Sequence, residues 1–125
     1  MSESLVIEIG WPAKELSPNS RCHYMVKHRY AKAAKTEAGW ATKIAKPINF
    51  GGDRFDVHIS AYPPKNWSTA DKDGFVSRLK WHLDAIAEAI GVNDRQFEAP
   101  SVEWCDKTEH GHVVIILRPR EAEAA

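Results

Sequence analysis

Alternating apolar and polar residues predict the strands of this chain. Residues 54–62 alternate strictly, with Phe55, Val57, Ile59 and Ala61 on one side and Asp56, His58 and Ser60 on the other. A period of two is typical of a strand with one buried face. Residues 5–9 show the same pattern more loosely. Residues 102–105 and 112–117 also have strand character, and the short polar segment between them predicts that they form a hairpin.

Two further segments predict helices. Residues 21–45 are rich in Ala and Lys and lack proline, which favours one long helix that Pro47 ends. Residues 73–90 carry an apolar stripe at helical spacing, with Asp73 placed as N-cap and Gly91 as C-cap. The order strand–helix–strand–helix–hairpin predicts an α+β fold, a small mixed β-sheet packed with two main helices. We expect a single domain over residues 1–125, with a disordered tail at about 119–125.

Composition narrows the class of protein. No apolar run approaches the ~20 residues that a membrane span requires, and the N-terminal sequence lacks the pattern of a secretory signal. Two cysteines, Cys22 and Cys105, are too few for a disulfide framework, although one bridge between them stays open. The sequence therefore predicts a soluble cytoplasmic protein with reduced thiols.

A balanced charge hides one basic segment. The chain has 17 basic and 17 acidic residues, yet residues 21–46 hold seven Lys and Arg against Glu37 alone. A local positive field attracts polyanions even when the net charge is zero, whereas the alternative is a solvated helix face. Tyr24, Tyr30 and Trp40 in this segment could stack on unpaired bases. Core packing of these three rings is the simpler interpretation, because aromatic side chains mostly bury.

Acidic residues surround the second predicted helix. Asp71 and Asp73 stand at its start, where both carboxylates could hold a hard cation such as Mg²⁺ or could cap the helix. In a continuous helix, Ser77, Lys80 and Asp84 follow Asp73 on one face, either as ordinary ion pairs or as the edge of an active site. Asp94 comes after the helix. It would reach Asp71 only through an adjacent strand or a partner subunit.

In this order and spacing, the motifs resemble the RusA-type Holliday-junction resolvases of phages and prophages. That family shows an Asp-X-Asp-Asn corner, a helix with a Lys and a later Asp, and a Gly-Val-Asp-Asp-type turn. The residues that carry the resemblance are Asp71-Lys72-Asp73-Gly74, Lys80, Asp84 and Gly91-Val92-Asn93-Asp94-Arg95-Gln96-Phe97, after the loop and basic helix LSPNSRCHYMVKHRYAKAAK. The similarity covers residues 5–118, which is nearly the whole chain.

The resemblance implies a metal-dependent endodeoxyribonuclease that cuts four-way DNA junctions symmetrically as a homodimer. It implies that Asp71, Asp73 and Asp94 hold Mg²⁺, with Mn²⁺ as a substitute, that Asp84 is a further acidic member, and that Lys80 is the catalytic lysine. The metal would activate water and stabilise the leaving oxygen. Contacts to DNA phosphates would come from Arg21, Lys27, Arg29, Lys32 and Lys35.

Two departures from the family pattern keep other functions open. Gly74 stands where the family usually has Asn, and Lys80 lies one helical turn later than in the shortest members, where Ser77 would align. The first departure favours the alternative of a catalytically inactive DNA-binding module of the same fold. A third hypothesis is an interaction domain whose basic helix packs on an acidic partner.

Overall fold

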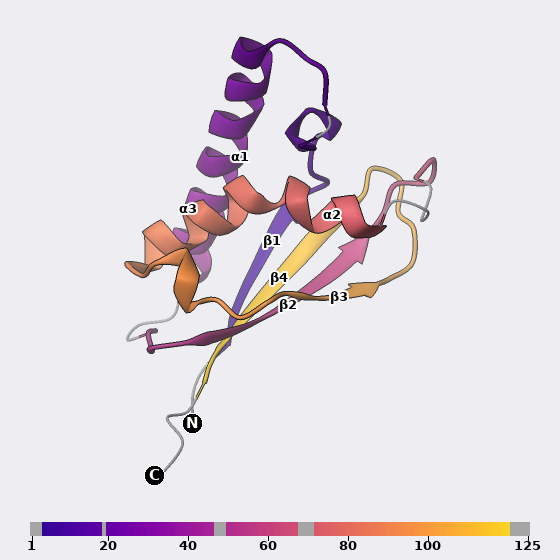
Figure 1. The fold of residues 1–125 in the computed structure, drawn as a ribbon. Coiled ribbons are helices and arrows are strands. Elements are labelled where there is room, and N and C mark those ends of the chain that lie inside the picture. Colours follow the sequence, from indigo (N-terminus) through magenta and orange to yellow (C-terminus); the bar gives the residue numbers. More distant parts are fainter. Residues whose placement is uncertain (1–3, 19, 47–49, 68–71, 121–125) are drawn as a thin grey trace.

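Figure 1 shows a four-stranded sheet with its helices on one face, in a computed structural model that describes residues 4–18, 20–46, 50–67 and 72–120. The elements are, in chain order, β1 (Leu5–Gly10), the 3-10 turn η1 (Lys14–Leu16), α1 (Tyr24–Ala45), β2 (Phe55–Tyr62), α2 (Lys72–Arg78), α3 (Lys80–Ile90), the 3-10 turn η3 (Asp94–Gln96), β3 (Ser101–Trp104) and β4 (His112–Pro119). This architecture confirms the predicted α+β class with a small mixed sheet.

The strand order is β1-β4-β2-β3, so β2 lies between the last two strands of the chain. β4 runs antiparallel to both β1 and β2, whereas β3 pairs in parallel with β2 at the edge of the sheet. The predicted hairpin between the last two strands is therefore wrong. β4 is the more apolar of the two, with Val113, Ile115 and Leu117 fully buried, and a central place gives these residues packed neighbours on both sides.

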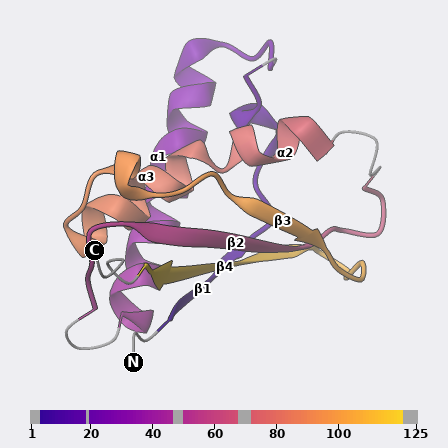
Figure 2. The ribbon, with the colours of Figure 1, turned by 60° about the horizontal axis from the view of Figure 1, so that its bottom comes forward.

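One face of the sheet builds the core. The alternation predicted for β2 is confirmed, because Phe55, Val57, Ile59 and Ala61 are buried under the helices. Phe75, Leu79 and Ile86 are the largest fully buried side chains that the helical layer adds to this cluster. Figure 2 shows that the opposite face of the sheet is not covered by any helix of the described segments.

Helix α1 packs against α3 through short side chains. It begins at Tyr24 rather than Arg21, after His23 accepts a hydrogen bond at Nδ1 from the Met25 N–H (3.2 Å). Its buried positions are Ala31, Ala34, Ala38 and Thr42. Small residues on a helix face let a second helix come close, so the neighbouring positions of α1 lie at the rim of the contact.

The second predicted helix is divided into α2 and α3 at Leu79. This residue is fully buried and takes the bridge conformation (φ −91°, ψ 0°), and its N–H bonds to the carbonyl of Val76 at 3.0 Å in a tighter 3-10 turn. The prediction of one continuous helix is therefore wrong, and the predicted polar face through residues 73–84 is interrupted at this turn. Asp73 lies inside α2 and does not cap it, whereas the predicted C-cap Gly91 is confirmed by its φ of 77°.

The described chain ends in an ordered segment after β4. β4 continues to Pro119, and Arg120 makes ion pairs with Asp56 and Glu98, so the expected tail is ordered at these two residues. The rest of that tail, residues 121–125, lies outside the described residues.

Cys22 and Cys105 are free thiols. No helix in the described part of the chain is long and apolar enough to cross a bilayer.

Gly111 tests the turn before β4. A Cβ built on Gly111 would lie 2.8 Å from Pro64 Cδ and 2.9 Å from the Pro64 nitrogen, at a φ of 76°. We expect Gly111→Ala to lower the free energy of unfolding by at least ~2 kcal/mol. Gly39→Ala is the control. A Cβ at Gly39, inside α1, meets nothing within 4 Å, so this change should stabilise the protein by ~0.5–1 kcal/mol. Equal effects in urea denaturation would contradict the turn geometry.

Candidate functional site

Two surface hollows follow one flank of α1 where it packs on α3, and we call them together the α1–α3 groove. The first, of about 600 Å³, is lined by Tyr24, Lys27, His28, Ala31, Lys32, Lys35 and Trp81. The second, of about 400 Å³, shares Lys35 and adds Thr36, Gly39, Trp40, Lys43, Ala85, Glu88 and Ala89. The lining therefore contains four lysines against one glutamate.

The sequence of α1 explains why the lysines share this flank. Lys32, Lys35 and Lys43 each come directly after one of the buried positions, which are Ala31, Ala34 and Thr42. One residue is about 100° of helical turn, so the three lysines lie beside the buried stripe and on the same side of it. Glu37 comes directly before the buried Ala38, which puts it on the opposite flank.

Aromatic rings lie among these lysines. Lys35 Nζ is 5.2 Å and Lys80 Nζ 5.1 Å from the centre of the Trp81 ring, and Lys43 Nζ is 5.5 Å from that of Trp40. Such contacts at exposed sites contribute only ~0.5–1 kcal/mol each. The ammonium groups are thus held beside the rings and remain exposed to a ligand.

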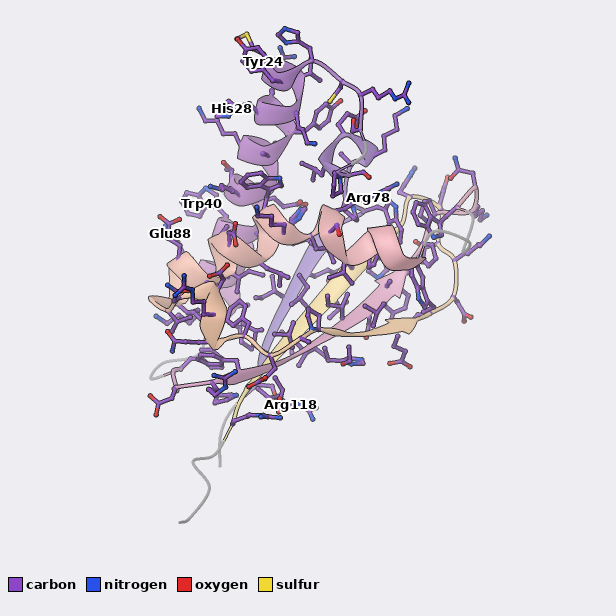
Figure 3. The ribbon with its side chains drawn as sticks, viewed as in Figure 1. Tyr24, His28, Trp40, Arg78, Glu88 and Arg118 are labelled. Atoms are coloured by element: carbon purple, nitrogen blue, oxygen red, sulfur yellow. The ribbon has the colours of Figure 1, made fainter. Side chains whose placement is uncertain are left out.

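The aromatic residues of α1 are exposed. Tyr24, Trp40 and Tyr30 have exposed fractions of 74%, 63% and 39%, so the prediction that they pack in the core is wrong. Figure 3 shows Tyr24 and His28 on the part of α1 that rises beyond the sheet, and Trp40 nearer to Glu88 of α3. Tyr24 and Trp40 line the groove, whereas Tyr30 does not. The buried face of α1 is made of three alanines and Thr42, and none of these rings belongs to it.

Glu37, the one acidic residue of the basic segment, makes its contacts on the flank of α1 opposite the groove, and its side chain is 47% exposed. Its Oε2 accepts a hydrogen bond from the Gly10 N–H (3.0 Å), and its Oε1 lies 3.6 Å from Nε2 of the buried His82. Interaction with His82, and next the Gly10 hydrogen bond, hold the pKa of Glu37 below its usual value, against the opposing effect of burial. The contact joins α1, α3 and β1, and it leaves the lysines of the groove without this counter-charge.

The predicted basic contacts have different outcomes. Lys27, Lys32 and Lys35 line the groove, with Lys27 Nζ also donating to the Ser17 carbonyl at 3.2 Å. Arg21 and Arg29 are exposed but do not line it. Lys43 and Trp81 were not among the predicted site residues and do line it. For Lys43 the signal was its place after a buried position, whereas Trp81 lies off the apolar stripe of its helix and carries no such signal.

Two of the predicted acidic residues, Asp73 and Asp94, lie at opposite ends of the helical layer. Asp71 lies outside the described residues, and Asp73 lies in the first turn of α2. Asp94 begins η3, beyond the end of α3, and Figures 1 and 2 show these two ends of the helical layer on opposite sides of the molecule. At 1.5 Å per residue, the helical layer from Asp73 to Ile90 is roughly 25 Å long. Lys80 and Asp84 lie between them on α3. The side chains that the structure describes contain no group of three His, Cys, Asp or Glu that could hold a metal ion.

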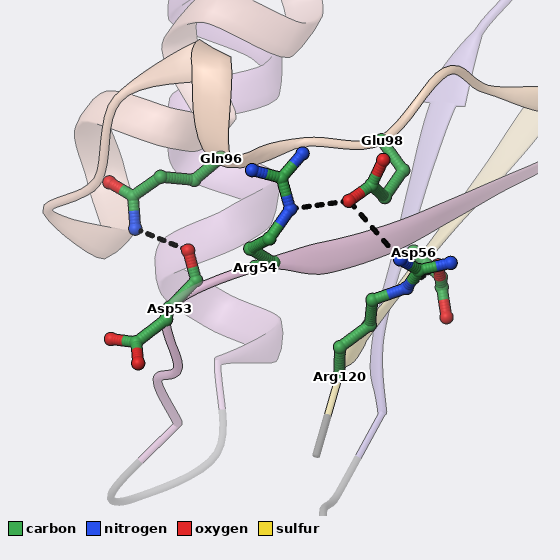
Figure 4. Close-up of polar contacts among 6 residues, drawn as sticks. All are labelled: Asp53, Arg54, Asp56, Gln96, Glu98 and Arg120. Atoms are coloured by element: carbon green, nitrogen blue, oxygen red, sulfur yellow. Dashed lines mark hydrogen bonds and ion pairs between the residues drawn. The ribbon is translucent and has the colours of Figure 1, made fainter. Parts of the chain in front are cut away.

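The segment that carries Asp94 is fixed to the start of β2. Figure 4 shows Gln96 Nε2 donating to the Asp53 carbonyl (2.9 Å) and the Arg54 side chain donating to Glu98. The Arg54 hydrogen bond holds the pKa of Glu98 below its usual value. Arg120 also contacts Glu98, at 3.4 Å. These contacts hold η3 at the far end of the sheet from the start of α2.

A further polar cluster lies on the uncovered face of the sheet, and it was not among the predicted sites. His58 Nδ1 is 3.0 Å from Ser101 Oγ, and His58 Nε2 is 3.2 Å from Glu103 Oε2. These are the residue types of a hydrolase triad. However, Ser101 Oγ also donates to the Val57 carbonyl (3.4 Å), and the His58 and Glu103 side chains are 40% and 64% exposed. We interpret the cluster as a cross-strand polar contact between β2 and β3.

The contacts of Glu37 predict how the free energy of unfolding depends on pH. A carboxyl whose pKa is lower in the folded protein stabilises it above the unfolded value of 4.5, and this contribution is lost as the pH falls through the folded pKa. We expect Glu37→Gln to lower the free energy of unfolding at pH 7 and to reduce its dependence on pH below about 4.5. Urea denaturation between pH 3 and 7 measures both. Glu88→Gln, at an exposed position of α3, is the control, and an equal effect there would contradict a specific role of Glu37.

The comparisons with known proteins give one informative match. No known family model matches the chain. The chain is 37% identical over 119 residues to an uncharacterized protein of Xylella fastidiosa (strain Temecula1 / ATCC 700964), and the match covers 89% of this chain and 74% of that protein. The chain therefore belongs to the same family as this Xylella fastidiosa protein.

Proposed function

We propose that the protein is a Mg²⁺-dependent, structure-selective endodeoxyribonuclease of RusA type, which resolves Holliday junctions or related branched DNA in the cytoplasm as a homodimer. The observation that carries the proposal is the α1–α3 groove, where four lysines and exposed aromatic rings gather on one flank of α1. The motif with Asp71 and Asp73 stands at the start of the helical layer, and α3 of this layer forms the other wall of the groove.

The groove has the chemistry of a nucleic-acid contact. Duplex DNA carries a phosphate charge about every 1.7 Å along its axis, and the groove follows α1 from Tyr24 to Lys43, about 28 Å at the helical rise. Several phosphates can therefore lie along it at once. Lysines form point contacts to phosphates, which position DNA without reading its sequence. This agrees with selection by shape rather than by sequence.

A metal site would need a second copy of the chain. Carboxylate oxygens are the ligands that Mg²⁺ prefers, so the donor set fits the metal, but Asp94 is fixed far from Asp73 in one chain. Two copies arranged with their helical layers antiparallel would bring Asp94 of each copy toward the Asp71–Asp73 motif of the other. Bound Mg²⁺ would supply activation of water and stabilisation of the leaving oxygen. Lys80, exposed at the start of α3, would neutralise charge on the phosphodiester.

The alternative is a DNA-binding module that does not cut. Gly74, in place of the usual Asn, removes a side-chain hydrogen bond beside the first two carboxylates, and the separation of Asp73 from Asp94 leaves one chain without a complete donor set. The groove does not depend on either feature. Binding without cleavage is therefore the result that would favour the alternative.

The salt dependence of binding tests the groove. Each phosphate contact adds about 0.9 to the slope of log affinity against log salt. We expect the Lys32→Gln, Lys35→Gln double variant to bind a four-way junction more weakly and to reduce this slope by about 1 to 2. Lys65→Gln, exposed in the loop after β2, is the matched control. Fluorescence anisotropy from 50 to 300 mM salt gives both values, and slopes equal to the wild type would place the DNA elsewhere.

Cleavage of a synthetic four-way junction tests the activity. We expect symmetric nicks in Mg²⁺, none on a linear duplex, and none with Asp73→Asn or Asp94→Asn, although both variants should still bind the junction. A metal-independent complex without cuts by the wild type would favour the inactive module.

Mixed dimers test whether the site is shared. When Asp73→Asn and Asp94→Asn chains are co-expressed with different tags and the heterodimer is purified, a shared arrangement leaves one site complete. Nicking of one strand should then return. If each chain supplied its whole site, both sites of the heterodimer would be defective, and no activity would return.

A further inference from the structure

We propose that Trp81 is the stacking platform for an unpaired nucleotide, which enters the 600 Å³ hollow of the α1–α3 groove. This inference rests on the proposed function, because it requires that the groove binds DNA. The inference adds a specific binding position within the groove, and it names the part of the DNA that binds there, which is an unpaired nucleotide. None of the residues predicted from the sequence to contact bases lies on α3.

The lining of this hollow fits a nucleotide. Its volume lies within the ~300–1,000 Å³ of typical small-molecule sites. It is lined by three lysines, His28, Tyr24, Ala31 and Trp81, and none of these lining residues is acidic. Cations for a phosphate and an aromatic floor for a base are therefore present together.

Trp81 is held rigidly enough to act as a platform. The ring is partly buried and packs against the small apolar cluster of Leu16, Ala31 and Ala34. These residues come from η1 and α1, so three elements fix one indole. A ring that is already positioned loses little freedom when a ligand binds.

The two lysines beside the ring can exchange places with a base. Lys35 and Lys80 are both exposed, and their ammonium groups lie 5.2 and 5.1 Å from the ring centre. The attraction of an exposed ammonium to an indole is weaker than the stacking of a base on it. A base can therefore take the ring while the displaced ammonium groups pair with the phosphates that flank it.

This arrangement favours an unpaired nucleotide over an acidic peptide. Carboxylates of a peptide would satisfy the lysines but would gain nothing from the indole face, whereas every base can stack on it. A paired base inside a duplex cannot reach the ring. Branched DNA offers bases that are unstacked where the strands exchange, which gives the site a reason to prefer a junction over a linear duplex.

The test compares two DNA hairpins that differ only in their unpaired tails, one of five thymidines and one of five abasic residues. We expect the wild type to bind the thymidine tail about 5- to 150-fold more tightly, the range of one to a few stacking contacts. Trp81→Leu keeps an apolar side chain against Leu16 but has no π face, so it should lose this preference. Trp81→Phe should retain most of it.

Controls separate stacking from folding. Tyr62→Leu removes an aromatic ring from the uncovered face of the sheet, where Tyr62 stacks on His112, and should leave the preference unchanged. Thermal unfolding of each variant shows whether it is folded at the assay temperature, and Trp81→Phe reports on the ring alone if Trp81→Leu is unfolded.

The possible results are distinct. A thymidine preference that persists in Trp81→Leu overturns the stacking role, while the proposed function stands if the junction is still bound. Absence of binding to any DNA by the wild type overturns the proposed function as well. If poly-glutamate displaces the thymidine-tailed hairpin as effectively, per charge, as poly-thymidine does, the groove is an acidic-protein surface and the nucleotide site is rejected.

Discussion

The close packing of α1 on α3 is the constraint on which the groove depends. Alanines and Thr42 fill the buried stripe of α1, and Thr42 satisfies its buried hydroxyl by donating to the Ala38 carbonyl at 2.7 Å. Because the contact is made by short side chains, the long lysine side chains that follow them in sequence lie at its rim. A larger residue in the stripe would push α1 and α3 apart, so that α3 would no longer form one side of the groove beside Lys35.

The same packing separates charge across α1. Glu37 uses its carboxylate on Gly10 and His82, so it contributes to the folded structure rather than to the charge of the groove. His82 is only 2% exposed, and its Nε2 lies beside this carboxylate. A carboxylate nearby reduces the cost of burying a polar ring. A chain with zero net charge thus presents a positive surface, since the one acidic residue of its basic segment lies on the other flank.

Local patterns predicted most of the fold, and contacts between distant segments account for what was missed. The two-residue period fixed which residues of β2 are buried, because that choice depends only on the alternation itself. Which strand pairs with which is decided by non-local packing. β4 is therefore in the centre of the sheet, although a hairpin with β3 was the shorter connection. The break at Leu79 was missed for the same reason. Leu79 fits an apolar stripe at helical spacing, and only its burial against the sheet requires the tighter turn.

The part of the candidate site that α1 alone supplies could be predicted from the sequence. The basic segment is a property of sequence, so Lys32 and Lys35 were found. The exposure of Tyr24 was not predictable, because it shares a helical face with Ala31 and Ala38 and is exposed only since this part of α1 rises beyond the sheet. Trp40 is exposed because it lies on the side of α1 away from the buried stripe. Trp81 was missed because it lies off the apolar stripe of its helix, and its place in the site follows from packing against distant residues of η1 and α1.

Binding and cleavage are separable in this molecule on physical grounds. A metal ion holds its carboxylate ligands at about 2 Å, whereas α2, α3 and η3 place Asp73 and Asp94 at opposite ends of a helical layer that is roughly 25 Å long. No side-chain movement spans that distance, and the contacts of Gln96 and Arg54 fix the far end to β2. The groove is complete in one chain, whereas a metal site that joined Asp73 to Asp94 would need a second copy. In the proposed enzyme, association of two copies is therefore the step that adds cleavage to DNA binding.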